Sequence, residues 1–249
     1  MKISIISICF NNEKDIRSTI ESVVNQTYQD IEYIIVDGSS KDNTLEIVNE
    51  YKDKIAKIIS EPDKGLYDAI NKGIKVATGD VVGLIHASDR LFNNEVIAKI
   101  ARHFDKNDIE ALYGHSKIIN AENGVDRINQ SPQFKKSLFK QGWFPSHQSF
   151  YVKRELFEKY GYYKLKYRIA ADYELVFRFL YCYDVKVSLL DEYIVLFSLG
   201  GTSTKSWKNI FELNKECAEA WKENGKRIPF YTIPLKLFRK IPQFIKAKF

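Results

Sequence analysis

The chain has 249 residues, enough to bury one substantial core, and its 45% hydrophobic and 28% charged content exclude a disordered protein. Its formal net charge of +6 is uneven, because residues 226–249 hold seven Lys or Arg and no acid and leave 31 basic against 32 acidic groups elsewhere. No apolar run reaches the roughly 18 residues of a transmembrane helix, and three scattered cysteines without metal-ligand spacing indicate free, buried thiols of a reducing compartment.

The first half of the chain alternates strand-like and helix-like runs. Short β-branched runs predict strands at residues 3–10, 31–36, 55–60 and 81–85. Amphipathic runs between them predict helices at residues 14–25, from a cap at 42–43 through 52, and at 66–77. The first apolar run is only strand-length, so we expect no secretory signal peptide. The repetition predicts an α/β fold with helices flanking a mostly parallel central sheet.

Polar residues follow each of these four predicted strands, at 11–12, 37–40, 61–65 and 86–89. The carboxyl ends of parallel strands meet at one edge of a sheet, and ligands bind in the crevice beyond that edge. We therefore expect one binding site built from four separate strand ends.

Beyond Asn120 the regular alternation is lost. A polar stretch at 121–132 and an aromatic segment at 134–163 predict loops, helices and one or two strands that build a second binding site over the first half. In the basic segment 226–249 a helical wheel puts Leu235 and its apolar neighbours opposite Lys236 and its basic neighbours. Such a segment suits anionic lipid headgroups, and packing of its apolar half on the rest of the chain is the alternative.

Four segments in a fixed order carry a resemblance to a known family: 7–12 (SICFNN), 22–26 (SVVNQ), 36–44 (VDGSSKDNT) and 63–73 (DKGLYDAINKG). Together they resemble family 2 glycosyltransferases with the GT-A fold, over a region from about residue 2 to about residue 203. The resemblance implies a Rossmann-like nucleotide half and an acceptor half. It also implies an inverting transferase that uses a nucleoside diphosphate sugar, commonly a UDP-sugar, with Mn²⁺ or Mg²⁺ on the diphosphate.

The resemblance implies a set of donor-binding residues at the strand ends. Asp37 matches the position that binds the base, and a carboxylate there can accept the imide N–H of uracil. Asp68 and Asn71, one helical turn apart, are expected to share one face toward the crevice. Turn formation and helix capping are the alternative roles for these residues. The full predicted set is Ser7, Asn11, Asp37, Asp63, Lys64, Asp68, Asn71 and Ser88.

The expected metal position departs from the family pattern. Relatives usually carry two adjacent aspartates after the fourth strand, whereas this chain has Ser88 in place of the first and keeps only Asp89. A hard cation such as Mn²⁺ or Mg²⁺ can still bind through one carboxylate, the donor phosphates and water. His86 is either a supplementary ligand or a neutral histidine held by the loop. The segment 197–203 resembles the loop that closes over the diphosphate in relatives, without the histidine that some of them carry there.

The predicted catalytic base is Asp172, which aligns with the aspartate of the family's acidic pair, while Ala171 replaces the acid before it. Inversion needs an attacking hydroxyl that loses its proton to a carboxylate on the side away from the diphosphate. A helix cap is the alternative role of Asp172, and Glu174 is expected to be a first-turn helix acid. The predicted acceptor-binding residues, for which core packing is the alternative, are Trp143, His147 and Gln148.

These expectations combine into one functional hypothesis. Residues 1–225 form a GT-A catalytic domain that moves a sugar from a UDP-sugar to a glycan acceptor, carried on a polyprenyl diphosphate lipid, in capsule, exopolysaccharide or lipopolysaccharide assembly. Residues 226–249 form a basic amphipathic tail that holds this cytoplasmic protein on the inner face of the plasma membrane. A non-catalytic nucleotide-sugar-binding protein and a nucleotidyltransferase are the alternatives, although residues 9–13 are no Gly-rich phosphate loop. Nucleic-acid binding is not expected, because no recognised module accompanies the charge.

Overall fold

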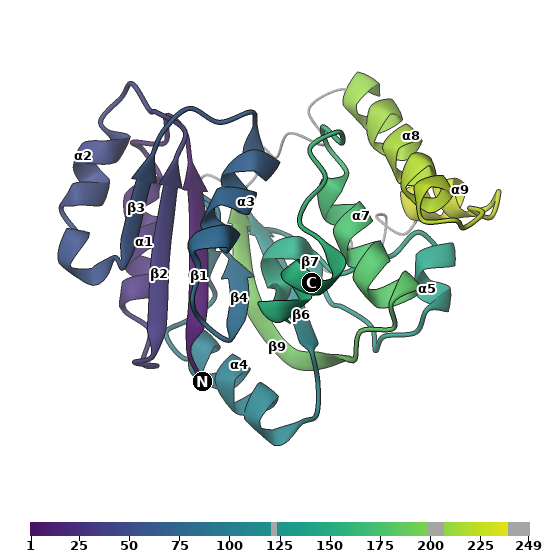
Figure 1. Cartoon of the computed structure of the whole chain (residues 1–249), viewed down its shortest axis with the longest axis horizontal. Helices are drawn as coiled ribbons and strands as arrows, with labels where there is room; N and C mark the ends of the chain where they lie inside the picture. The colour runs from purple at the N-terminus through teal and green to yellow at the C-terminus, as the bar shows by residue number, and fades with distance from the viewer. Residues whose placement is uncertain (121–123, 199–206, 239–249) are drawn as a thin grey trace.

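One sheet runs through the molecule, and the computed structural model describes residues 1–120, 124–198 and 207–238. The strand order is β3-β2-β1-β4-β8-β6-β9-β5, with β7 paired to β6 (Figure 1). In that order the bounds are Lys57–Ser60, Ile31–Asp37, Ile3–Cys9, Val81–Leu84, Phe150–Lys153, Ala111–Ile119, Val187–Ser198 and Arg90–Leu91, and β7 is Val125–Asn129.

Helices cover both faces of this sheet. Their bounds are α1 (Ile16–Val24), α2 (Thr44–Asn49), α3 (Leu66–Val76), α4 (Val96–Lys106), α5 (Ser137–Lys140), α6 (Glu155–Tyr160), α7 (Ala171–Phe177), α8 (Trp207–Glu223) and α9 (Thr232–Phe238). Short helical turns lie at η1 (Lys52–Lys54), η2 (His147–Ser149) and η3 (Arg178–Cys182), the last of them π-helical. None of the helices within the described ranges is both long and apolar enough to cross a bilayer.

The predicted α/β fold is confirmed, and its parallel part coincides with the first half of the chain. Strands β3, β2, β1 and β4 are all parallel, with Ile3 of β1 opposite Ile31 on one side and Val81 on the other. Beyond β4 the sheet becomes mixed, because β8 runs antiparallel to both β4 and β6 while β9 runs parallel to β6. The sequence of the second half lacks the strand–helix–strand rhythm for this reason.

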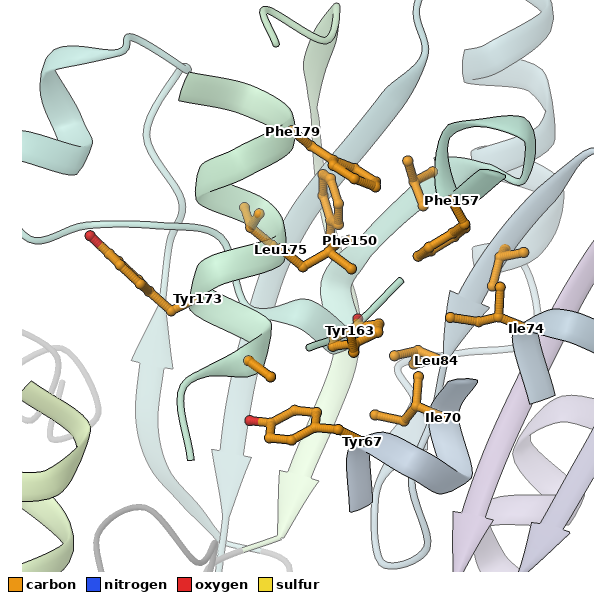
Figure 2. Packing of buried hydrophobic residues seen from close by; sticks show 14 of the residues in the cluster. Tyr67, Ile70, Ile74, Leu84, Phe150, Phe157, Tyr163, Tyr173, Leu175 and Phe179 are labelled. Atoms are coloured by element: carbon orange, nitrogen blue, oxygen red, sulfur yellow. The ribbon is translucent and has the colours of Figure 1, made fainter. Parts of the chain in front are cut away.

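Alternating side chains give the sheet two separate cores. On β1, Ile6 and Ile8 face a cluster shared with α3, α6, α7 and α8, whereas Ile3 and Ile5 face a cluster shared with α1 and α4. Successive side chains of a strand point to opposite faces, so a central strand buried on both sides is apolar throughout. Figure 2 shows the first cluster, in which Tyr67 and Ile70 of α3 lie between the sheet and the α7 side of the molecule.

The described start of the basic segment packs on the rest of the chain. The Thr232 hydroxyl at the start of α9 donates to the Lys140 carbonyl at 2.7 Å. Lys236, expected on the polar face of an amphipathic helix, is buried, whereas Leu235 of the expected apolar face is 38% exposed. The helical wheel therefore misjudged these two positions, because α9 docks through the side that carries Lys236. Residues 239–249 lie outside the described ranges.

Candidate active site

Asp37 is the last residue of β2 and lies at the edge where the carboxyl ends of the parallel strands meet. Its side chain is fully buried, and its carboxylate accepts hydrogen bonds from the Ser60 hydroxyl at 2.7 Å, the Ser40 amide at 3.1 Å and the Ser40 hydroxyl. These bonds tie the ends of β2 and β3 together. The orientation of the Asp37 carboxylate is therefore fixed by its neighbours.

The loops after the first three strands touch one another, as the parallel pattern predicts. Asn11, which follows β1, adopts a left-handed φ of 52°, donates from its amide to Ser40 Oγ at 2.8 Å and accepts from the Lys41 amide at 2.8 Å. A Cβ on Gly38 would lie 2.6 Å from Asp63 Oδ2, so the Asp63 side chain lies directly against Gly38 and the loops after β2 and β3 are in contact. Asn11, Asp37 and Asp63 therefore share one edge.

The start of α3 presents part of the predicted donor set. Asp63 Oδ1 accepts from the Gly65 amide at 2.7 Å, and Asp68 Oδ2 accepts from the Lys64 amide at 3.0 Å in the manner of a capping box. The Lys64 side chain is exposed beside them. Both aspartates thus have the helix-start role that was the alternative, and their second carboxylate oxygens remain in reach of solvent or a ligand.

Two predicted donor residues take places that differ from those expected. Asn71 is buried and exchanges two hydrogen bonds with the backbone of Tyr163, at 2.8 and 3.0 Å, so it clamps α3 to the second half and does not share an open face with Asp68. Ser7 is fully buried, and its Oγ accepts from the Tyr33 hydroxyl at 3.0 Å. Both side chains are enclosed because their elements are packed on two sides.

The segment after β4 carries the candidate metal ligand. Asp89 is 8% exposed; its Oδ1 accepts from the Ser198 amide at 3.0 Å and its Oδ2 from the Gln148 side chain. Burial raises the pKa of Asp89 to about 7. Ser88 adopts a left-handed φ of 84°, a conformation that costs a non-glycine residue about 1–3 kcal/mol, and its hydroxyl donates to Asp15 Oδ2 at 3.1 Å.

These residues fit a cation held by a single protein carboxylate. A buried carboxylate with a raised pKa is a group that gains from a cation nearby. His86 Nδ1 is buried, and no described residue bonds to it. Within the described ranges no cluster of three or more His, Cys, Asp or Glu side chains is suited to a metal ion. Most ligands of a cation here would therefore have to come from the diphosphate and water.

A chain of three side chains connects the end of β4 to α7. His86 Nε2 lies 3.0 Å from His147 Nε2, and His147 Nδ1 lies 3.2 Å from Asp172 Oδ2. The pKa of His86 is lowered to about 3 by burial and by the neighbouring His147. His147 donates from Nδ1 to Asp172, because a carboxylate can only accept, and the direction of the bond between the two histidines depends on the tautomer of each ring.

Asp172 is held in the first turn of α7 by contacts from several elements. Its Oδ1 accepts from the Tyr173 amide at 2.8 Å and, at a longer 3.3 Å, from the Tyr67 hydroxyl of α3, which shares its proton with the Ile169 carbonyl at 2.7 Å. Burial would raise the pKa of Asp172, but the hydrogen bond and charge of His147 together hold that pKa below its ordinary value. The carboxylate is therefore ionised at neutral pH, as a proton acceptor must be.

The N-cap residue of α7 makes no side-chain capping hydrogen bond, and a side chain of α8 bonds the amides at this helix start instead. Ala170 is the N-cap residue, and Glu216 of α8 accepts hydrogen bonds from the amides of Arg168, Ile169 and Ala170 at 2.7 to 2.9 Å. Free amides at a helix start need acceptors, and a carboxylate there is also favoured by the helix dipole. Glu216 thereby fixes the turn that presents Asp172.

Comparison with known proteins decides the family. The model of glycosyl transferase family 2 matches residues 4–163. The chain belongs to glycosyl transferase family 2. This family 2 glycosyltransferase is 33% identical over 179 residues to an uncharacterized glycosyltransferase of Mycobacterium tuberculosis, Rv1514c, which covers 71% of this chain and 68% of the relative. A PGL/p-HBAD biosynthesis glycosyltransferase of the same organism, Rv2957, is 30% identical over 178 residues, covering 70% of this chain and 68% of the relative.

Solved structures share the fold of this family 2 glycosyltransferase. S. aureus TarS (residues 1–349), crystallised with UDP-GlcNAc, superimposes with a TM-score of 0.71 at 20% identity, over 88% of this chain and 66% of TarS. The mannosyltransferase PcManGT of Pyrobaculum calidifontis, solved with GDP-Man and Mn²⁺, gives a TM-score of 0.67 at 15% identity, over 96% of this chain and 68% of PcManGT. The chain thus spans about two thirds of the proteins it matches. The GT-A expectation is confirmed by these likenesses.

The three predicted acceptor residues differ in how much surface they leave open. Trp143 is half-buried and meets the Tyr113 ring edge-on at 5.6 Å, so part of its surface belongs to the core. Both ring nitrogens of His147 are engaged, and the buried Gln148 donates to Asp89. Trp143 alone among the three offers open surface without breaking a described hydrogen bond. Glu174 is buried in an ion pair with Arg178 at 3.0 Å, in line with its expected structural role.

Two residues that hold Asp172 were not singled out in the sequence. Tyr67 sits inside the motif at 63–73 but reads as an apolar helix position, and Glu216 lies 44 positions after Asp172 in an ordinary helix pattern. The one sequence signal is the spacing of apolar residues in α8, which predicts that one face of this helix is buried. An acidic side chain on that face needs a buried partner. Of the predicted loop 197–203, residues 199–203 lie outside the described ranges.

Proposed function

We propose that this protein moves a sugar from a nucleoside diphosphate sugar, of the UDP-sugar class, to a hydroxyl of a glycan acceptor with inversion at the anomeric carbon. The observation that carries the proposal is the Asp172 carboxylate, ionised and held by His147 and Tyr67. A carboxylate arranged in this way suits the removal of a proton from an attacking hydroxyl. TarS, solved with UDP-GlcNAc, and PcManGT, solved with GDP-Man, support a nucleoside diphosphate sugar as the donor.

Each part of the reaction has a residue suited to it. The acceptor oxygen attacks the anomeric carbon and its proton passes to Asp172, while the bond from that carbon to the diphosphate oxygen breaks and the diphosphate leaves with the electron pair. His147, donating to Oδ2, keeps the carboxylate from rotating. Oδ1 accepts two hydrogen bonds and Oδ2 accepts one in the described contacts, so the second lone pair of Oδ2 is the position for the proton.

The donor would lie along the edge formed by Asn11, Asp37 and Asp63, with Lys64 near the phosphates. Asp89 is the residue that would hold a Mn²⁺ or Mg²⁺ ion, together with donor oxygens and water. When bound, such an ion supplies positive charge to the leaving diphosphate. Ser88 and Lys64 could bond the same phosphates directly.

A protection screen tests the donor class. The full chain is melted with UDP, UDP-sugars, GDP-mannose and UTP, each with and without Mn²⁺. A specific ligand at about 100 times its dissociation constant stabilises the folded state by about 2.7 kcal/mol. We expect one UDP-sugar to protect more than UDP alone, and transfer or hydrolysis of that sugar to release UDP. Protection by UTP alone would favour a nucleotidyltransferase, and protection without any turnover would favour a binding protein.

We further propose that the acceptor is lipid-linked and that the basic segment 226–249 contacts the inner membrane surface. The relative Rv2957 is named for PGL/p-HBAD biosynthesis, which supports a cell-surface glycan pathway. Phe230, 93% exposed, and Tyr231 stand beside the exposed Lys226 and Arg227. An exposed aromatic with basic neighbours suits the interface of an anionic bilayer, where each basic residue contributes about 1 kcal/mol.

Sedimentation with vesicles tests the membrane contact. We expect the full chain to pellet with phosphatidylglycerol vesicles at low salt, to stay in solution with phosphatidylcholine vesicles, and to be released as salt rises. Phe230→Ser should weaken the binding, whereas Val125→Ser, which removes an exposed apolar side chain from β7, should not. Equal recovery of wild type and Phe230→Ser in the supernatant with anionic vesicles would rule out the membrane role.

A further inference from the structure

Lys236 is the one lysine among the buried residues that the structure describes, with 8% of its surface exposed. Lysine is almost never buried to this extent without a charged partner, because removing an ammonium from water is costly. The residue lies in α9, outside the 4–163 region that the family model matches. The family pattern therefore does not explain why Lys236 is buried.

The neighbouring residues leave room for the Lys236 side chain. A Cβ on Gly142, which has a left-handed φ of 75°, would lie 2.5 Å from the Lys236 Cβ, so a larger residue there would displace α9. The hydrogen bond from Thr232 to the Lys140 carbonyl fixes the start of the same helix. The two contacts come from the last residue of α5 and from the turn after it, and they hold α9 against this part of the chain.

The Lys236 ammonium meets no full negative charge in its described contacts. Its Nζ donates to Cys217 Sγ at 3.1 Å and lies 5.5 Å from the centre of the Tyr173 ring. Burial raises the pKa of the Cys217 thiol, so that thiol is uncharged at neutral pH. A buried cation at this position is not expected to stabilise the fold more than a well-packed apolar side chain would.

The buried position of Lys236 is explained by its relation to Asp172. Tyr173, whose ring faces the ammonium, follows Asp172 directly and donates its amide to the Asp172 carboxylate. The charge of Lys236 adds to that of His147 in lowering the pKa of Asp172. Tyr173 thus connects the buried ammonium to the carboxylate proposed as the base.

We propose that Lys236 is a positioning residue for Asp172: its buried ammonium packs on the Tyr173 ring and so holds the start of α7, and its positive charge acts on the Asp172 carboxylate. The inference rests on the proposed role of Asp172 as the base. This role of Lys236 makes α9 a part of the acceptor half. The basic segment 226–249 then contributes to the active site, whether or not it also contacts a membrane. The titratable groups that face Asp172 or act on its charge are His147, His86, Tyr67, Tyr163, Cys217 and Lys236.

The test compares Lys236→Met with Lys236→Arg and with Lys226→Met, which removes an equal charge from an exposed position. The Asp172 carboxyl is followed by carbon-13 NMR of the full chain, with its signal assigned through Asp172→Asn. We expect Lys236→Met to raise the pKa of Asp172 by about 0.5–1 unit and Lys236→Arg to restore most of the shift. Lys226→Met should leave it unchanged. The thermal stability of Lys236→Met should equal or exceed that of wild type.

Turnover separates this inference from the proposed function. With the UDP-sugar selected by the protection screen, the acid limb of the pH–rate profile should move upward by the same 0.5–1 unit in Lys236→Met. An unmoved Asp172 titration in a folded Lys236→Met protein overturns the inference, whatever the activity. If the Met variant fails to fold, Lys236→Gln replaces it in the same comparison. Full turnover in Asp172→Asn would overturn the base assignment while leaving a measured Lys236 effect on the carboxyl intact.

Discussion

The two halves of the molecule build their parts of the site in different ways. In the nucleotide half, from β1 to β4, the strand-end residues are fixed by neighbouring strands: Asp37 is held by Ser40 and Ser60. In the acceptor half, Asp172 is held by residues far away in the chain, Tyr67 and His147, and by the cap from Glu216. A parallel sheet brings strand ends together by its topology, whereas a base on a separate helix has to be held by tertiary contacts.

This difference predicts distinct responses to mutation. Changes in the nucleotide half should affect donor binding or stability, because its residues fix the edge where we propose that the donor lies. Changes in the acceptor half should affect the chemical step while leaving donor binding in place. Three substitutions test this division, in decreasing order of their expected effect on turnover.

Asp89→Ala should have the largest effect, because Asp89 lies where the two halves meet and is the one carboxylate expected to hold the cation. We expect the Mn²⁺-dependent part of donor protection to disappear and turnover to fall by about 10³ or more. Thermal melting with and without Mn²⁺ measures the first and UDP release the second. Full activity of the wild type in excess chelator would show that no metal is needed and that Lys64 or another cation offsets the diphosphate charge.

Asp172→Asn should lower transfer by roughly 10², the usual scale for the loss of a positioned base. Donor protection should stay within error of wild type, because no part of the nucleotide edge changes. Asp191→Asn, an exposed carboxylate of β9, is the matched control and should turn over normally. Near-normal turnover in Asp172→Asn would remove this residue from the mechanism and with it the division of labour between the halves.

Glu32→Gln should leave turnover unchanged and reduce stability. Burial alone would raise the pKa of Glu32, but hydrogen bonds from Ser4 and Thr78 and the charge of Lys2 lower it to about 2. A depressed folded pKa contributes stability that is present above the unfolded value and is lost as pH falls toward the folded one.

That linkage sets the pH window of the Glu32 experiment. We expect Glu32→Gln to lose about 2–3 kcal/mol in urea unfolding at pH 7, with the difference from wild type shrinking between about pH 4.5 and pH 2. Glu46→Gln, on an exposed turn of α2, should cost little at any pH. A deficit that persists undiminished at the lowest pH would mean that Glu32 acts by packing and not by its charge.

The nucleotide half was predictable because its information is local. The alternation at residues 3–10 and 31–36 specifies β1 and β2, and their parallel pairing then places Asn11 and Asp37 at one edge. Asp89 and Asp172 were also identified from sequence, through the resemblance and not through any periodic pattern.

The surroundings of Asp172 could not be predicted in the same way. The contact of His147 with both His86 and Asp172 joins three separate segments, and nothing in the spacing of these residues indicates it. Lys236 was assigned to a polar helix face because a helical wheel does not include tertiary neighbours such as Gly142, whose missing side chain makes room for it. Ser7 and Asn71 differ from expectation for the related reason that a polar side chain near a strand end or helix start can still be enclosed by packing.

The cap that Glu216 gives to α7 has a consequence for the order of events during synthesis. The four parallel strands and their helices are complete once the first 84 residues have left the ribosome, and domains begin to fold from the N-terminus as they emerge. The turn before Asp172, by contrast, keeps unbonded amides until α8 has also emerged. A nascent chain can therefore assemble its nucleotide edge early and remain without a positioned base until α8 has emerged.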